Sequence, residues 1–130
     1  MKNIILETKR LILRPFCKKD LSYFKKLLKD PDVMRFSING PYKDDLKIEK
    51  FLNTILENQK KYGFGSMAIL LKKTKKYIGF FGVFKKYEKI RDFGYRLFKK
   101  FCEKGYATEA VKVCIDYLKK TFRMKKSIVI

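Results

Sequence analysis

The sequence contains no histidine, no tryptophan and only three cysteines in 130 residues. Without histidine, neither a Ser-His-Asp triad nor a Cys-His pair nor a histidine metal site can be built. The cysteines, Cys17, Cys102 and Cys114, share no CxxC spacing, which argues against a zinc site, so we expect no metal. An odd number of unpaired cysteines fits the reducing cytoplasm.

Long apolar runs are also missing. The first residues, MKNIILETKRLILRPF, carry Glu7, Lys9 and Arg10 where a secretory signal would be apolar. No run approaches the length that crosses a membrane. We therefore expect a cytoplasmic protein that does not bind a membrane.

Acidic residues are scarce: 13 stand against 33 basic ones, which gives a net charge of +20. Such a charge attracts polyanions such as RNA, an anionic membrane or a phosphorylated cofactor. Alternatively, because the lysines are scattered along the whole chain, they form a solvated surface that favours solubility. The sequence has no RNA-recognition motif, helix-turn-helix or zinc finger, so we expect no specific nucleic-acid binding. With 46% apolar and 15% aromatic residues, the chain can bury the core of one folded domain.

The first half of the chain predicts one strand followed by two helices. RLILRPF (10–16) is rich in β-formers and ends near a proline, as edge strands do. A helix follows Asp20, its expected N-cap, with its apolar residues on one face. A second amphipathic helix begins near Asp44 and ends at Gly63, the expected C-cap.

The second half predicts three strands, a helix and a last strand. The runs 66–73 and 77–86, joined by TKK, predict a hairpin in which Gly79 and Gly82 indicate a bulge or a close backbone neighbour. Residues 92–97 alternate like a strand, a helix begins near Thr108, and KKSIVI (125–130) predicts a final strand. The order β-α-α-β-β-β-α-β defines a mixed α/β domain.

The segment DFGYRLFKKFCEKGYATEAV (92–111) combines a strand, a basic loop and a glycine that opens a helix. Backbone N–H groups at such a helix start can hold a phosphate. The simpler alternative is that Gly105 only starts the helix and ATEA only packs it.

Four segments, TKRLILRPF, DPDVMRF, YIGFFGV and DFGYRLFKKFCEKGYATEAV, together resemble the GNAT superfamily of acyl-CoA-dependent N-acetyltransferases. The most similar subgroup acetylates protein N-termini and includes ribosomal-protein alanine N-acetyltransferases. The resemblance implies a GNAT-like, mainly antiparallel sheet flanked by helices, with acetyl-CoA as co-substrate and no metal. It also implies an amine acceptor, for which a protein N-terminus is one candidate.

The resemblance further implies which residues hold acetyl-CoA. The small residues of the loop would let backbone N–H groups approach the pyrophosphate, lysines would add positive charge, and the strand end would pair with the pantetheine arm. These residues are Leu97, Phe98, Lys104, Gly105, Tyr106, Ala107 and Thr108. The sequence departs from the family at Glu103, where a glycine is usual; its carboxylate would repel a phosphate.

Transfer to an amine requires that the amine lose its proton before it attacks, and a carboxylate can accept this proton. Asp92 aligns with an acidic position that starts this strand in many relatives, which makes it the first candidate base; Glu88 is the second. Either residue can instead be an exposed acid near a turn. Tyr95 and Tyr106 are candidate proton donors or packing residues.

Relatives continue beyond the strand predicted at 127–130 with a further helix and two strands. The resemblance therefore implies that residues 1–130 form a single GNAT domain that is incomplete at its C-terminus and lacks the last helix and strands. Its last strand would be an exposed edge, able to form a homodimer or to aggregate. Three hypotheses stay open: an N-acetyltransferase, a degenerate inactive relative, and a basic RNA- or ribosome-binding module.

Overall fold

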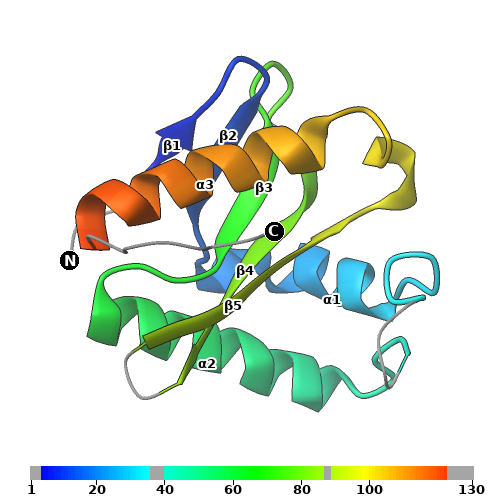
Figure 1. Cartoon of the computed structure of the whole chain (residues 1–130). Coiled ribbons are helices and arrows are strands. Elements are labelled where there is room, and N and C mark those ends of the chain that lie inside the picture. Colours follow the sequence, from blue (N-terminus) through cyan, green and yellow to red (C-terminus); the bar gives the residue numbers. More distant parts are fainter. Residues whose placement is uncertain (1–3, 36–39, 87–88, 123–130) are drawn as a thin grey trace.

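The computed structural model describes residues 4–35, 40–86 and 89–122, without the side chains of 84–86, 89–93 and 121–122. Its centre is a five-stranded antiparallel sheet in the order β1-β2-β3-β4-β5 (Figure 1). The strands are β1 (Leu6–Glu7), β2 (Leu11–Pro15), β3 (Met67–Leu71), β4 (Tyr77–Lys86) and β5 (Lys89–Leu97). The helices are α1 (Leu21–Lys29), α2 (Asp45–Tyr62) and α3 (Tyr106–Phe122), with 3-10 turns at Lys18–Asp20 and Lys99–Phe101.

The mixed α/β fold and its mainly antiparallel sheet are confirmed. Strand β1 was not predicted, because two residues are too few to show alternation; it pairs through Leu6 with Leu13 of β2. Strand β5 begins at Lys89, three residues before the expected start at Asp92. The strand predicted at 127–130 lies outside the described residues.

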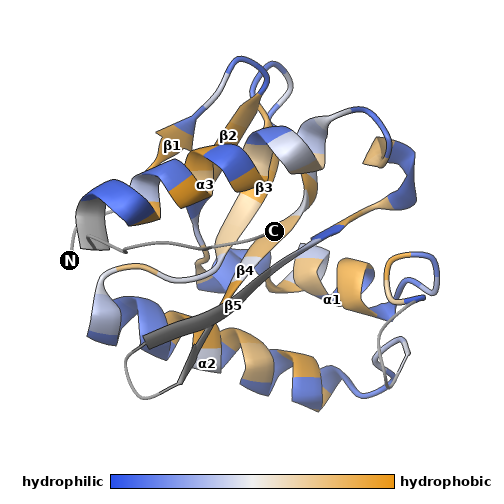
Figure 2. Ribbon diagram, in the orientation of Figure 1, coloured by the Kyte–Doolittle hydropathy of each residue, from blue (hydrophilic) through white to orange (hydrophobic). Residues whose placement is uncertain are grey.

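The helices cover the two faces of the sheet, as Figure 1 shows: α3 lies on one face, and α1 and α2 lie on the other. Because side chains alternate along a strand, β3 sends Ile69 to the α3 core and its neighbour Ala68 to the α1–α2 core. Figure 2 shows the apolar stripes of the helices turned toward the sheet. None of the described helices is both long and apolar enough to cross a membrane.

The predicted ends of α2 are confirmed. The Asp44 carboxylate accepts a hydrogen bond from the N–H of Leu46 at 2.9 Å, which caps the first turn. At the other end Gly63 has a φ of 78°, the left-handed conformation that favours glycine.

Asp20 stands at the N-cap position of α1, as predicted, but its side chain makes no capping hydrogen bond to that helix. Its carboxylate instead receives both terminal nitrogens of Arg14, at 2.8 and 2.7 Å, and the N–H of Cys17 at 2.9 Å. Asp20 is buried, so the paired guanidinium on β2 offsets the cost of removing its charge from water.

The close backbone neighbour expected at Gly79 is present. A Cβ atom at this position would lie 2.0 Å from the carbonyl oxygen of Arg96 on β5. The β3–β4 register also shifts here, from Ile69 opposite Gly79 to Leu70 opposite Tyr77, so that Ile78 is the additional, bulged residue. The bulge and the glycine together let the end of β5 lie close against β4.

Candidate functional site

The loop formed by residues 98–105 connects β5 to α3. It starts with the 3-10 turn Lys99–Phe101, whose Phe101 ring is buried in the core under α3. Two of its residues then have left-handed backbone conformations: Glu103, with a φ of 61°, and Gly105, with a φ of 81°. The expectation that a glycine turn opens the helix is confirmed. The same conformation explains why a glycine would also suit position 103, which Glu103 occupies instead.

Helix α3 begins at Tyr106, two residues earlier than expected. Its first helical hydrogen bond runs from the N–H of Glu109 to the carbonyl of Gly105, at 3.1 Å. The N–H groups of Tyr106, Ala107 and Thr108 therefore have no acceptor within the helix. Gly105 and Thr108 are exposed, so the positive end of the helix dipole lies at the surface, where an anion can reach it.

The end of β5 exposes a backbone edge beside this loop. The N–H of Phe98 donates to the carbonyl of Ile78 at 3.0 Å, and the Arg96 carbonyl also faces β4. Because backbone groups alternate along a strand, the N–H and C=O of Leu97 point to the other side of β5. On that side the carbonyl of Leu97 accepts a weak hydrogen bond from the Cys102 thiol, with the sulfur 3.9 Å from the oxygen. Among the described residues the N–H of Leu97 has no hydrogen-bond partner, so it can pair with an extended ligand.

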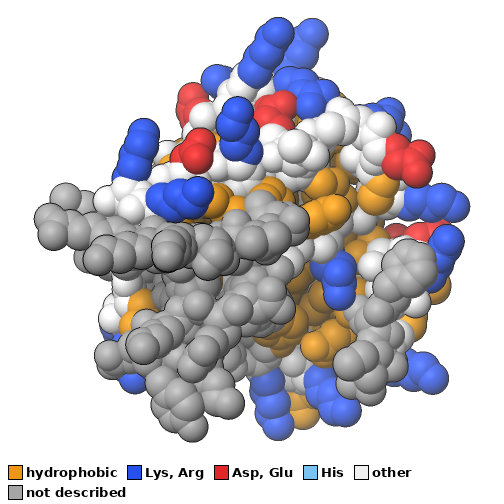
Figure 3. Space-filling view, in the orientation of Figure 1, with side chains coloured by type: hydrophobic (Ala, Val, Ile, Leu, Met, Phe, Trp, Pro, Cys, Tyr) orange, Lys and Arg blue, Asp and Glu red, His pale blue; other side chains and the backbone are white. Residues whose placement is uncertain are grey.

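Exposed lysines surround the loop. Lys99, Lys100 and Lys104 lie on it, and the ammonium groups of Lys76 and Lys100 lie 5.5 and 5.9 Å from the centre of the Phe101 ring. Figure 3 shows that Lys and Arg side chains are spread around this face of the molecule rather than gathered in one strip. The local charge therefore favours an anion, but it is not a continuous track for a nucleic acid.

Arg10, in the turn between β1 and β2, ties the loop and α3 to the sheet. Its Nε donates to the Glu109 carboxylate at 2.8 Å, its Nη1 donates to the Lys104 carbonyl at 3.0 Å, and its guanidinium lies 4.3 Å from the centre of the Tyr106 ring. The hydroxyl of Thr8 also donates to Glu109. Thr8, Arg10 and Glu109 were not among the predicted site residues, although all three lie in the motifs TKRLILRPF and ATEAV.

The pKa of Glu109 reflects this environment. Burial raises the pKa of its carboxyl group, but the hydrogen bonds from Thr8 and from the side chain and backbone of Arg10 lower it by more. The resulting pKa lies below the ordinary value of 4.5, so Glu109 is ionised at neutral pH and its charge is paired with Arg10.

Residues 10–130 match the family model described as "Acetyltransferase (GNAT) domain". The chain belongs to this family. The structure of an acetyltransferase from Agrobacterium tumefaciens str. C58 superposes with a TM-score of 0.81 and 25% identity, over 95% of this chain and 71% of that one. RimL, a ribosomal L7/L12 alpha-N-protein acetyltransferase solved with coenzyme A, superposes with a TM-score of 0.71 and 13% identity, over 88% of this chain and 67% of RimL.

Among curated proteins, the uncharacterized protein YkkB of Bacillus subtilis (strain 168) is 29% identical over 116 residues. The match covers 86% of this chain and 66% of YkkB, so the chain spans slightly less than two thirds of the length of that relative.

Seen as a GNAT domain, the structure brings the seven predicted acetyl-CoA residues together in one continuous stretch, from the end of β5 through the loop to the first turn of α3. Of the two predicted bases, the structure describes the backbone of Asp92 alone. Asp92 lies in β5 with its backbone opposite Phe84, and its side chain is outside what the structure describes; Glu88 lies outside the described residues. Of the two tyrosines, Tyr95 is 44% exposed, while Tyr106 packs against Arg10.

Two of the three free cysteines lie on α3 and on the loop before it. Cys114 is buried in the α3 core, and burial raises the pKa of its thiol. Cys102 is exposed, with its Sγ 3.7 Å from the carbonyl of Phe98. Within residues 4–35, 40–86 and 89–122, no three His, Cys, Asp or Glu side chains are grouped so that they could hold a metal ion.

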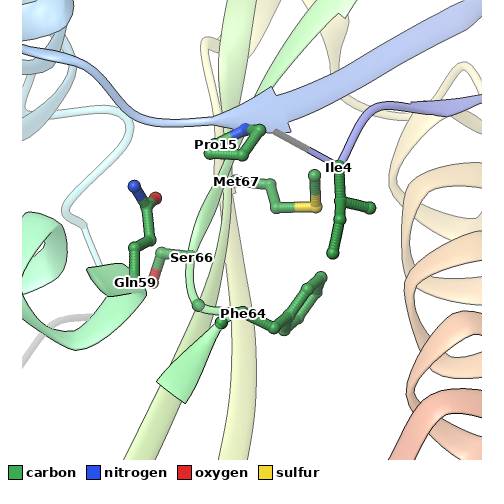
Figure 4. Close-up of a pocket in the computed structure, with 8 residues that line it drawn as sticks. Ile4, Pro15, Gln59, Phe64, Ser66 and Met67 are labelled. Atoms are coloured by element: carbon green, nitrogen blue, oxygen red, sulfur yellow. The ribbon is translucent and has the colours of Figure 1, made fainter. Parts of the chain in front are cut away.

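A separate pocket of about 250 Å³, including the open space above it, lies near the Pro15 end of β2 (Figure 4). Figure 4 shows Phe64 and Met67 pointing toward Ile4, while Gln59 points the other way. The amide of Gln59 already bonds the N–H and C=O of Phe16, at 2.9 and 3.1 Å. This pocket is mainly apolar and lies at the opposite end of β2 from Arg10, so it belongs to the fold rather than to the loop site.

Proposed function

We propose that this chain is an N-acetyltransferase that transfers the acetyl group of acetyl-CoA to an amine, with Asp92 as the general base. The observation that carries this proposal is the arrangement of loop and helix. Glu103 and Gly105, both in left-handed conformations, lead the chain into α3. The first three N–H groups of this helix have no acceptor within it, and the backbone of Leu97, at the start of the same connection, faces away from β4. The family assignment supports the same reaction class.

Each part of this arrangement matches one part of acetyl-CoA. The N–H groups of Tyr106, Ala107 and Thr108 would bind the pyrophosphate, supported by the helix dipole and the loop lysines. The backbone of Leu97 would pair with an amide group of the pantetheine arm, as a further strand would. Phe98 would lie beside the arm without pairing with it, because its N–H donates to Ile78 and its carbonyl accepts the N–H of Phe101. The side chain at position 105 is a hydrogen atom, which leaves the backbone accessible to the phosphate oxygens.

In the reaction, the neutral amine nitrogen attacks the carbonyl carbon of the thioester, the C–S bond breaks, and coenzyme A leaves as a thiolate that takes up a proton. The ammonium form of the amine cannot attack, so a base must remove its proton first.

The Asp92→Asn variant should lower kcat about 100-fold at neutral pH and leave the Kd for acetyl-CoA unchanged. The loss should shrink as the pH rises, because the amine then deprotonates without help. If Asp92→Asn leaves kcat unchanged, Asp92 is not the general base, and Glu88 is the next residue to test.

The net charge of the molecule limits the range of acceptor substrates that it favours. A net charge of +20 repels polyamines and basic peptides and favours neutral or acidic acceptors. We propose protein N-termini of this kind as the substrate class. Peptides with acidic residues after the N-terminus should give a higher kcat/KM than basic ones, and the ratio should fall with added salt, because salt screens charges beyond about 8 Å at physiological strength.

The first test is thermal unfolding of the chain with and without millimolar acetyl-CoA, with AMP as the control. A ligand at one hundred times its Kd stabilises the folded state by about 2.7 kcal/mol, which raises Tm by several degrees. A rise that AMP does not reproduce supports the proposal. A cooperative transition that acetyl-CoA leaves unmoved would refute it and favour a degenerate relative. Tight RNA binding that weakens steeply with salt would favour the basic binding module.

A further inference from the structure

The turn between β1 and β2 reaches across the sheet edge to both sides of Gly105. Arg10 donates to the carbonyl of Lys104, the residue before the glycine, and its guanidinium lies over the ring of Tyr106, the residue after it. A Cβ atom on Gly105 itself would lie 3.2 Å from Nη2 of Arg10. One side chain therefore contacts three consecutive residues of the predicted phosphate-binding segment.

The carboxylate of Glu109 fixes this guanidinium in turn. It accepts from Nε of Arg10 at 2.8 Å and from the backbone N–H of the same residue at 3.1 Å. The hydroxyl of Thr8 donates to Oε2 of Glu109, the same oxygen that accepts the backbone N–H of Arg10, and it accepts the N–H of Leu11 at 2.9 Å. The guanidinium fork of arginine can hold a carboxylate and a carbonyl at once, whereas the ammonium of lysine is a single point charge.

Glu109 lies in the first turn of α3, where a carboxylate would oppose a bound phosphate if its charge were free. The ion pair with Arg10 neutralises that charge. The Arg10 side chain is 41% exposed and that of Glu109 is 21% exposed, so the pair is partly open to solvent rather than sealed in the core.

We propose that Arg10, held by Glu109 and Thr8, is a positioning residue that keeps the Lys104–Gly105–Tyr106 backbone in the conformation that receives the diphosphate of the acyl donor. This inference rests on the proposed function. It assigns to the β1–β2 turn, about 100 residues away in the sequence, a role in donor affinity. A purely structural brace would lower stability without discriminating between donors.

Two donors separate these roles: acetyl-CoA, which carries the diphosphate, and S-acetyl-pantetheine, which does not. The variant Arg10→Met keeps an unbranched apolar stem and removes all the donors of the side chain. We expect it to raise the Kd for acetyl-CoA at least tenfold and to change the Kd for S-acetyl-pantetheine less than twofold. Both Kd values can be followed by NMR titration of the full chain, so the test does not require turnover.

Lys72→Gln is the matched control. The side chain of Lys72, in the turn after β3, binds the same hairpin, through Glu7 at 3.3 Å and the carbonyl of Thr8 at 3.2 Å. Neither of these contacts involves α3 or its loop. Lys72→Gln removes one positive charge, as Arg10→Met does. We expect this control to leave the ratio of the two Kd values within twofold of the wild-type ratio. Arg10→Lys keeps the charge without the fork, and we expect it to recover less than half of the lost affinity on a logarithmic scale.

The outcomes distinguish this inference from the proposed function. A wild-type chain that binds neither donor refutes the proposed function, and the inference with it. A wild-type chain that binds acetyl-CoA, together with an Arg10→Met variant that binds it equally well, refutes the inference alone. If Arg10→Met weakens the binding of both donors equally, Arg10 acts only as a structural brace, and the inference is wrong. If Arg10→Lys restores the full affinity for acetyl-CoA, only the positive charge of Arg10 matters, and the inference is also wrong. If Arg10→Met does not unfold cooperatively, the donor ratio of Arg10→Lys decides, with an unchanged ratio counting against positioning.

Discussion

Glu103 brings two unfavourable features to the loop, a strained backbone conformation and a negative charge, and a single substitution to glycine removes both. Its φ of 61° is a conformation that L-residues with a Cβ atom adopt at a cost, and its carboxylate lies two residues before Gly105. The variant Glu103→Gly should therefore stabilise the folded chain and strengthen acetyl-CoA binding together. The variant Glu103→Gln removes only the charge, which allows the two effects to be measured separately.

The gain in stability follows from the backbone. The left-handed conformation costs a residue with a Cβ atom about 1–2 kcal/mol, and a glycine adds about 0.5–1 kcal/mol of unfolded-state entropy. The net gain for Glu103→Gly is then about 0.5–1 kcal/mol, or a rise in Tm of about 2–5 °C for a domain of this size. Lys75→Gly, in the turn between β3 and β4, is the matched control: its φ is 63°, so it should give the same rise.

The gain in affinity follows from Coulomb's law. At about 8 Å in water, one carboxylate and a doubly charged diphosphate repel each other by about 1 kcal/mol before screening. Screening leaves about 0.4 kcal/mol at 0.15 M salt and about 0.8 kcal/mol at 0.01 M. Glu103→Gly and Glu103→Gln should therefore tighten acetyl-CoA binding about twofold at 0.15 M and about fourfold at 0.01 M. Lys75→Gly should not tighten it, because it removes no negative charge.

The assay is thermal unfolding for stability and titration calorimetry for the acetyl-CoA Kd, at both salt concentrations. If Glu103→Gly and Lys75→Gly both fail to raise Tm, the argument from backbone strain is wrong. If Glu103→Gln leaves the Kd unchanged at low salt, the diphosphate does not lie near this loop, and the proposed position of acetyl-CoA is wrong.

Three further predictions concern the fold that supports the site, and thermal unfolding checks all of them. Gln59→Leu should cost about 2–3 kcal/mol, because it leaves the buried N–H and C=O of Phe16 without their partner; a smaller loss than 1 kcal/mol would contradict this. Gly79→Ala should cost about 3 kcal/mol, because its Cβ atom would lie 2.0 Å from the carbonyl of Arg96, and an unchanged Tm would show that β4 and β5 can separate freely. Tyr77→Phe should raise stability by about 1 kcal/mol, because among the described residues the buried Tyr77 hydroxyl has no hydrogen-bond partner; a fall would reveal one.

Local patterns predicted most of the elements because the signals that define them are themselves local. The apolar spacing of α1, α2 and α3 recurs every three to four residues, and the acid at Asp44 and the glycine at Gly63 mark the ends of α2 within one turn. The close approach at Gly79 was predictable for a similar reason, since a glycine inside a strand often marks a position without room for a side chain.

Where tertiary contacts compete with local signals, the prediction was incomplete. Asp20 stands at a helix start and has the side chain of an N-cap, but Arg14 on β2 binds its carboxylate at 2.7 Å and turns it away from α1. Strand β1 consists of two residues, and it forms because β2 offers a partner rather than because its own pattern specifies a strand.

The sequence by itself determined the order of the elements from β2 to α3, the caps of α2 and the continuous stretch from Leu97 to Thr108, all of which depend on neighbours a few residues apart. Only the tertiary structure decided that Arg10 and Thr8 meet Glu109, which lies 99 and 101 positions away along the chain. That meeting requires α3 to pack across β1 and β2 on one particular face of the sheet. The physical reason is that the formation of a helix depends on the spacing of apolar residues within the helix itself. Its position on a sheet depends on the shapes and charges of surfaces that are distant in the sequence and meet only in the folded chain.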